Sequence, residues 1–125
     1  YLDYLKQKNI PMAVATSSDE ALYLATFEHL GLNGYFDKIV TAKEVGCGKN
    51  QPDIYIEAAK RLNIDISDCV VFEDIYMGMK SANEAGFFTV IMEDESSKRQ
   101  REQLKAEAGI YITDFSQLLE KESLF

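Results

Sequence analysis

The chain has 125 residues, of which 46% are hydrophobic and 27% are charged, and this is enough for one domain with its own buried core. A formal net charge of −8 argues against a nucleic-acid partner and against an anionic membrane surface. It leaves small anionic substrates open, because a local site can still be positive. The two cysteines, Cys47 and Cys69, have neither CxxC nor Cys/His spacing, which predicts free thiols in a reducing cytoplasm and no zinc site. No signal peptide or transmembrane run is visible, so no membrane partner is expected.

Along the chain, short apolar runs that are typical of buried strands alternate with patterns that are typical of helices. Helices are expected at residues 1–8, 17–30, 52–62, 75–85, 97–108 and 114–121. Strands are expected at residues 10–15, 38–41, 69–72, 86–92 and 110–112. This alternation predicts a parallel sheet with helices on both faces. Because the sequence starts without an initiator Met and inside a helical pattern, we expect it to be part of a longer protein.

A first polar group, Thr16-Ser17-Ser18, follows the first expected strand. Ser17 with Glu20 fits a capping box, so these residues are expected to begin the next helix. Hydroxyls and free N–H groups at a helix N-terminus can also bind a phosphate oxygen, and this use is compatible with capping. Thr16 and Ser17 are therefore candidate phosphate-binding residues. The core face of this helix is expected to contain Ala21, Leu24, Ala25, Phe27 and Leu30.

A second polar group is Lys49, at the end of a loop that is expected at residues 42–50. Two glycines precede Lys49, and a proline followed by an acid begins the next helix, as the physics of helix capping favours. Most lysines are solvated surface charges, and Lys60 on that helix is expected to be one. A lysine that is held between glycines and a rigid helix start can instead provide a point charge for phosphate.

A third polar group is the acid pair Glu73-Asp74, which ends the apolar run at residues 69–72. Such a run is typical of a strand that is buried on both faces. One explanation of the pair is that both acids favour the positive end of the following helix. The alternative is a site for a hard cation, because ligands of open α/β sheets bind outside the carboxyl ends of the strands, and carboxylate oxygens suit such cations.

These three groups fall at strand or loop ends that should lie on one rim of the sheet. A hydroxyl, a fixed cation and a metal-binding acid pair are what phosphoryl transfer requires, because positioning and charge neutralisation provide most of its catalysis. No residue of the chain is a convincing nucleophile. A receiver-like regulatory domain also combines such groups, but its acid pair comes before the hydroxyl and the lysine, whereas this chain has the acid pair last.

With these motifs, the sequence resembles the haloacid dehalogenase-like superfamily, particularly its β-phosphoglucomutase-like phosphatase and mutase branch, over about residues 1–113. The resemblance rests on segments 13–18, 48–55 and 71–74, together with Gly78 and Ala85-Gly86, in the order that the family has them. It implies a Rossmann-like, three-layer α/β/α fold with a mostly parallel sheet.

The resemblance also implies roles for the candidate residues. Thr16 would hydrogen-bond the transferring phosphoryl group with help from the Ser17 N–H, and Lys49 would neutralise the charges of the phosphate and the nucleophile. Asp74 would bind Mg²⁺ directly, and Glu73 directly or through water. The implied activity is Mg²⁺-dependent hydrolysis of a small phosphorylated metabolite. The alternatives are a sugar phosphomutase and a non-catalytic regulatory or scaffold domain.

Two parts of the family pattern are absent from the sequence. The first is the DxDGT motif, which supplies the aspartate nucleophile and further metal ligation, and the second is the helical cap domain that helps to select the substrate. In addition, Ile75 stands where the family often has Ser or Thr, and Tyr76 and Met77 replace small residues or proline.

We therefore expect residues 1–125 to be the C-terminal part of a single core domain, inactive alone and dependent on the missing N-terminal part of its own protein. In the resembled fold, the strand order is third, second, first, fourth, fifth. The first strand would then be missing between the strand that contains residues 12–15 and the strand that contains residues 70–72.

Overall fold

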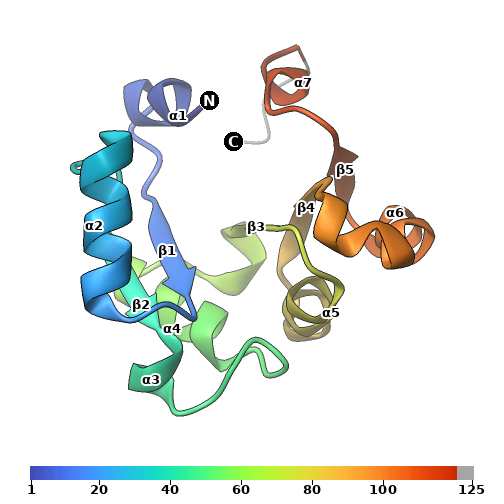
Figure 1. The fold of residues 1–125 in the computed structure, drawn as a ribbon, viewed down its shortest axis with the longest axis horizontal. Coiled ribbons are helices and arrows are strands. Elements are labelled where there is room, and N and C mark those ends of the chain that lie inside the picture. The colour runs from blue at the N-terminus through green and yellow to red at the C-terminus, as the bar shows by residue number, and fades with distance from the viewer. Residues whose placement is uncertain (121–125) are drawn as a thin grey trace.

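The computed structural model describes residues 1–120, in which strands and helices alternate along the chain (Figure 1). The strands are β1 (Ala13–Thr16), β2 (Lys38–Thr41), β3 (Val70–Glu73), β4 (Phe88–Met92) and β5 (Ile110–Ile112). The α-helices are α1 (Leu2–Gln7), α2 (Glu20–Leu30), α3 (Ala42–Val45), α4 (Asp53–Leu62), α5 (Tyr76–Ala85), α6 (Arg101–Glu107) and α7 (Ser116–Leu119). Two 3₁₀ helices are η1 (Ile66–Asp68) and η2 (Glu95–Gln100).

All strand pairs are parallel, and they form two separate sheets within residues 1–120. One sheet pairs β1 with β2, and the other has the order β3-β4-β5. The predicted α/β architecture with parallel pairing is therefore confirmed. The inner edge of β1 and that of β3 have no strand partner among the described residues, which agrees with the expected strand order if its first strand is left out.

Side chains alternate across the β3-β4-β5 sheet with the period of two that a pleated strand imposes. On one face, Ile91 packs with Met79 of α5 and Leu104 of α6. On the other face, Val90 and Ile112 pack with Leu118 of α7. Tyr1 joins this second cluster, and its ring stacks on that of Phe115 at 6.1 Å between centroids. This sheet therefore lies between two helical layers.

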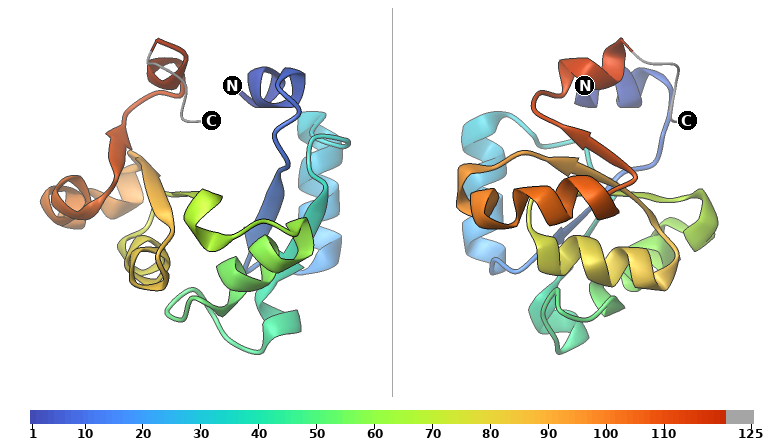
Figure 2. Two further views of the ribbon diagram at one scale, coloured as in Figure 1. Left: turned by 180° about the vertical axis from the view of Figure 1, so that it is seen from behind. Right: turned by 90° about the vertical axis from the view of Figure 1, so that its right-hand side faces the viewer.

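Helix α4 joins the two sheets. Its residues Ile54, Tyr55 and Ala59 are buried in one cluster with Val40 of β2 and, from the other half, Ala82 of α5 and Phe87. Figure 2 shows the resulting arrangement, with β1, β2 and α2 in one half and β4, β5, α5 and α6 in the other. Side-chain contacts, mainly through α4 and also through Tyr1, hold the two halves together, and no backbone ladder joins them within residues 1–120.

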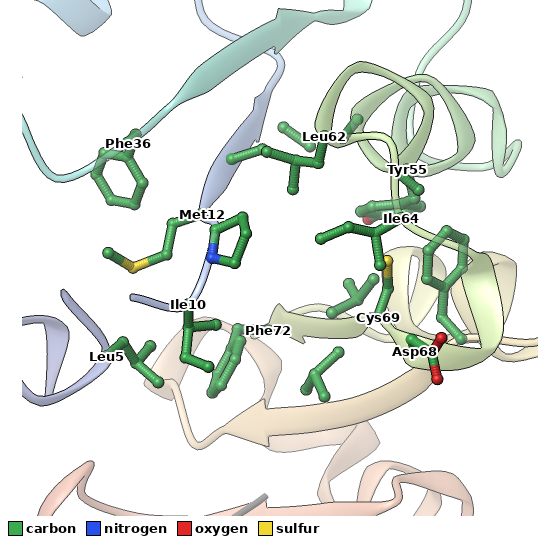
Figure 3. Close-up of a pocket in the computed structure, with 18 of the residues that line it drawn as sticks. Leu5, Ile10, Met12, Phe36, Tyr55, Leu62, Ile64, Asp68, Cys69 and Phe72 are labelled. Carbon is green, nitrogen blue, oxygen red and sulfur yellow. The ribbon is translucent and has the colours of Figure 1, made fainter. Parts of the chain in front are cut away.

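An apolar cavity of about 470 Å³ lies between β1 and β3 (Figure 3). Its walls include Ala13 and Ala15 of β1 and Val70, Val71 and Phe72 of β3. Further apolar side chains come from the N-terminal segment, from the end of α4 and from the residue before β3, namely Leu5, Ile10, Met12, Leu62, Ile64 and Cys69. The cavity therefore occupies the place where the expected sheet order has its missing strand.

The structure differs from several local expectations. Helix α2 is capped by Asp19, whose side chain accepts the Leu22 N–H, so the predicted Ser17–Glu20 capping box is wrong. The loop expected at residues 42–50 contains α3, which has a capping box of its own between Thr41 and Glu44. The helix expected at residues 97–108 begins as η2, and the predicted helix end at residue 121 lies outside the described residues.

The predicted core face of α2 is also wrong, except for Phe27. None of the residues of α2 is buried, and Leu24 and Leu30 are exposed. The inward side is formed by Tyr23 and Phe27, and Phe27 meets the Phe36 ring at 5.5 Å between centroids. Apolar residues occur all around this helix, so counting them along the sequence could not identify the packed side. Over residues 1–120, no helix has the length and apolar character to cross a bilayer.

Candidate active site at the end of β3

The site is built around Glu73, the last residue of β3 and a buried carboxylate with 7% of its surface exposed. Its Oε1 accepts hydrogen bonds from Lys49 Nζ and from the Tyr55 hydroxyl, each at 2.6 Å. Its Oε2 accepts the Asp74 backbone N–H at 3.2 Å. Three donors thus satisfy this carboxylate, as burial of a charge requires.

Lys49 is held at both ends. Its backbone carbonyl accepts the Ser81 hydroxyl of α5 at 2.7 Å, and its ammonium forms the ion pair with Glu73. Twenty per cent of the Lys49 side chain is exposed, against 4% of the Glu73 side chain. The ammonium has three donors, and the pair uses one of them, so a ligand at the rim can accept the others.

Asp74 follows β3 and lies half-buried beside Glu73. Burial, then the charges of Glu73 and Asp94, raise the pKa of the Asp74 carboxyl, while Lys49 acts in the opposite direction. The Asp74 carbonyl accepts the Ser97 hydroxyl at 2.8 Å, which fixes the backbone after the strand. A carboxylate that is desolvated next to other acids is stabilised by a bound cation.

Thr16 ends β1, and its Oγ1 accepts the Ser18 N–H at 3.0 Å. This bond leaves the hydroxyl hydrogen of Thr16 free to donate to another acceptor. The side chain of Ser17 is exposed. Within residues 1–120, no hydrogen bond joins Thr16 or Ser17 to Lys49 or to the acid pair. The structure therefore brings Lys49, Glu73 and Asp74 together, and leaves the hydroxyl group of Thr16 as a separate group at the end of β1.

The acid pair offers carboxylate oxygens, which are the type of ligand that Mg²⁺ prefers. Glu73 and Asp74 are the candidate ligands, and among residues 1–120 no group of three or more His, Cys, Asp and Glu residues could hold a metal ion. Mg²⁺ is commonly bound by one or two carboxylates together with waters and substrate phosphate. The acid pair therefore fits part of a magnesium site, with Asp74 better placed because Glu73 already accepts three hydrogen bonds.

Lys49, Glu73 and Asp74 were expected at the site from the sequence, whereas Tyr55, Gly78 and Ser81 carry no signal in it for the contacts that they make here. Tyr55 lies in the first turn of α4 and reaches Glu73 from there. A Cβ at Gly78 would lie 2.6 Å from the Tyr55 hydroxyl oxygen and 2.9 Å from Glu73 Cδ. Periodicity along one strand or helix carries no signal for such contacts between elements.

Comparisons with known proteins agree with this architecture. Residues 1–86 match the family model for haloacid dehalogenase-like hydrolases. The fructose-1-phosphate phosphatase YqaB of Escherichia coli is 42% identical over 80 residues, which cover 64% of this chain and 43% of that protein. The validoxylamine A 7′-phosphate phosphatase of Streptomyces hygroscopicus subsp. limoneus is 32% identical over 117 residues, which cover 94% of this chain and 53% of that protein.

Solved structures give the same result. A family IA, variant 3 hydrolase of Entamoeba histolytica is 35% identical with a TM-score of 0.80, and the match covers 93% of this chain and 52% of that one. A β-phosphoglucomutase of Clostridium difficile is 26% identical with a TM-score of 0.74, over 94% of this chain and 48% of that one. The chain thus spans about half the length of these relatives. It belongs to the haloacid dehalogenase-like hydrolase family.

Proposed function

We propose that the intact protein is a Mg²⁺-dependent phosphatase that hydrolyses a small phosphate monoester, and that residues 1–125 supply the C-terminal part of its core domain. The observation that carries this proposal is the Lys49–Glu73–Asp74 arrangement at the end of β3. The phosphatase relatives support it, because two of them are named for phosphorylated small molecules. The net charge of −8 argues against nucleic acid as a substrate and leaves a small phosphorylated metabolite open.

Each residue has a role that follows from its free donors or acceptors. Lys49 presents the N–H groups that Glu73 leaves free to the phosphate oxygens and to the nucleophile, and so offsets their negative charge. Thr16 donates its hydroxyl hydrogen to a phosphoryl oxygen while Ser18 holds its oxygen in place, and the Ser17 N–H assists. Asp74, with Glu73 directly or through water, would hold Mg²⁺, which neutralises charge on the transferring group.

The nucleophile and a strand between β1 and β3 are proposed to come from the rest of the protein. Three observations support this part: the inner edges of β1 and β3 lack partners among the described residues, the cavity between them is apolar, and the matched regions cover only 43% and 53% of two relatives. A parallel strand there would satisfy the backbone N–H and C=O groups of both edges. Its carboxyl end would deliver an aspartate of the DxDGT type to the rim that carries Thr16 and Lys49.

A cytoplasmic location is part of the proposal, and it is supported by the free thiols of Cys47 and Cys69. A second candidate function is sugar phosphomutase activity, which the likeness to a solved β-phosphoglucomutase favours. The two reactions differ in the acceptor of the phosphoryl group, which is water in a phosphatase and a sugar hydroxyl in a mutase. Release of inorganic phosphate from sugar phosphates, against conversion of one sugar phosphate to another, distinguishes the two functions.

The test uses the intact protein with a panel of sugar phosphates and p-nitrophenyl phosphate, with and without Mg²⁺. We expect phosphate release that requires Mg²⁺ and that falls about 10²- to 10³-fold in Lys49→Ala, because a fixed charge at the developing anion is lost. Lys60→Ala is the matched control, since Lys60 is an exposed lysine on α4, and it should retain wild-type turnover. If the intact protein showed neither hydrolysis nor mutase activity, the proposed function would be contradicted in favour of a non-catalytic scaffold.

The role of the cavity has its own test. The 125-residue chain alone is expected to aggregate or to show weak amide protection at β1 and β3, and to have no phosphatase activity. The upstream part of the protein, added as a separate polypeptide, should restore protection and Mg²⁺-dependent hydrolysis. A well-protected monomer that hydrolyses phosphate esters without that part would contradict the proposal.

A further inference from the structure

We propose that Tyr55 is a positioning residue of this site, whose hydroxyl holds the Glu73 carboxylate so that Glu73 keeps the Lys49 ammonium at the rim. The role of Lys49 rests on the proposed function, whereas the contact between the three side chains does not. Tyr55 is not expected to touch the substrate. It acts through Glu73, which lies between the tyrosine and the lysine.

The geometry around Glu73 Oε1 is the first observation. Tyr55 and Lys49 both donate to this one oxygen, each at 2.6 Å, from the first turn of α4 and from the loop before it. Tyr55 is only 4% exposed, and its ring packs edge-on against Phe87 at 6.3 Å between centroids. A ring that is fixed in the core cannot follow the carboxylate, so the hydroxyl defines where Oε1 lies.

The second observation is Gly78, in the first turn of α5. Glycine has a lower helix propensity than alanine. At this position a Cβ would lie 2.6 Å from the Tyr55 hydroxyl oxygen and 3.0 Å from Glu73 Oε1. The absence of a side chain at residue 78 thus makes room for this hydrogen bond, which gives a reason for glycine at a position where helix propensity disfavours it.

The chemical consequence concerns how the lysine is held. With two donors on Oε1, the carboxylate is fixed, and the ammonium is held in one direction with its remaining N–H groups available to phosphate. Burial, and then the bond to Glu73, raise the pKa of the Tyr55 hydroxyl, so it stays a donor. Without that hydroxyl, Oε1 would lose one of its two donors, the carboxylate could rotate, and the ammonium would move with it.

The main test is Tyr55→Phe in the intact protein, because phenylalanine keeps the buried ring and removes only the hydroxyl. With p-nitrophenyl phosphate and Mg²⁺, we expect kcat to fall about tenfold or more, the size of a lost hydrogen bond to a charged group, while KM stays within about twofold. Tyr111→Phe is the matched control, since it removes another tyrosine–glutamate bond, to Glu93 at 3.1 Å, and kcat should be unchanged.

A second readout needs no activity. Without Mg²⁺, the rate at which an amine-specific reagent modifies Lys49 is followed by mass spectrometry. We expect a several-fold faster modification of Lys49 in Tyr55→Phe and an unchanged rate in Tyr111→Phe. If the wild type hydrolyses no phosphate ester, the proposed function is wrong, and this labelling experiment still decides the role of Tyr55. Wild-type labelling and wild-type kcat in Tyr55→Phe would overturn the positioning role and leave the proposed function intact.

Gly78→Ala provides a test by double substitution. Its Cβ should displace the Tyr55 hydroxyl, so the single variant should lose kcat at least as strongly as Tyr55→Phe. In the Tyr55→Phe/Gly78→Ala double variant, the Tyr55 hydroxyl oxygen, which lies closest to the new Cβ, is absent. The kcat of the double variant should therefore be no lower than that of Gly78→Ala alone. Independent effects that multiply in the double variant would contradict the shared contact.

Discussion

The Lys49–Glu73 ion pair should contribute to stability in a way that a double-substitution cycle can measure. Lys49→Met removes the ammonium and keeps the length of the side chain, which leaves the carboxylate of Glu73 buried without a counter-charge. Loss of one partner of a buried pair costs about 3–5 kcal/mol. Because 20% of the Lys49 side chain is exposed, water can partly replace the lysine, so we expect about 2–3 kcal/mol.

In the double variant Lys49→Met/Glu73→Gln, no unpaired charge remains. Its loss of stability should therefore be smaller than the sum of the two single losses by about 1–2 kcal/mol. Urea unfolding of the intact protein, followed by circular dichroism, gives these values. With a typical slope of about 2 kcal/mol per molar urea, Lys49→Met should lower the midpoint by about 1 M.

A control pair separates this effect from a general effect of losing charge. Lys98 and Glu95 form an ion pair at 3.2 Å on η2, but their side chains are 62% and 80% exposed. Lys98→Met should leave the urea midpoint unchanged, because exposed pairs contribute little. Strict additivity in the Lys49/Glu73 cycle, or an equal loss in both lysine variants, would refute the reasoning from burial.

Three further outcomes are expected. Asp74→Asn should abolish Mg²⁺-dependent turnover. Burial raises the folded-state pKa of Asp74, so the metal-free wild type should lose stability as the pH rises from about 4 through that pKa. Urea titrations at several pH values should show this loss in the wild type and not in the Asn variant. Thr16→Val should lower kcat/KM for phosphate release about 10²-fold, as loss of one donor to a developing anion does. An unchanged kcat/KM would contradict the donor role of Thr16. Gly109→Ala should destabilise the protein by about 1–3 kcal/mol in urea unfolding, since its Cβ would lie 2.6 Å from the Thr89 carbonyl oxygen. Gly48→Ala is the control: its Cβ would have its nearest contact at 3.5 Å, so the same assay should show no such loss.

The strands and the acid pair could be predicted because their signals are local. An apolar run such as Val70–Phe72 followed by two carboxylates predicts a strand that ends in acids without any knowledge of contacts with other elements. Lys49 and Glu73 could be expected on one rim of the sheet from the order of strand and loop ends, but their direct ion pair could not. The link through Tyr55 could not be predicted, because it depends on how α4 lies against the end of β3, and a tyrosine among Ile54 and Ala59 looks like an ordinary core residue.

Helix α2 shows that a local hydrophobic pattern can also predict burial where there is none. Its sequence contains enough apolar residues for a buried face, yet Leu22, Leu24 and Leu30 are all exposed and only Tyr23 and Phe27 turn inward. A hydrophobic pattern states which residues could be buried, whereas burial itself depends on what packs there. The cap of the helix is also not predictable from the sequence, because Ser17, Ser18 and Asp19 are all good caps and propensity alone does not rank them.

The division of residues 1–120 into two sheets has a consequence for how this part of the protein would respond to heat. Lys49 precedes α4, which packs on β1 and β2, whereas Glu73 and Ser81 belong to the half that contains β3, β4 and β5. The bonds from Lys49 to Glu73 and Ser81 therefore run from one half to the other. In the 125-residue chain alone, a small separation of the halves would break these bonds while each half keeps its own parallel ladder. The arrangement of Lys49 with Glu73 would then be lost on heating before the secondary structure is, whereas a strand between β1 and β3 in the intact protein would keep the two halves, and with them the site, together.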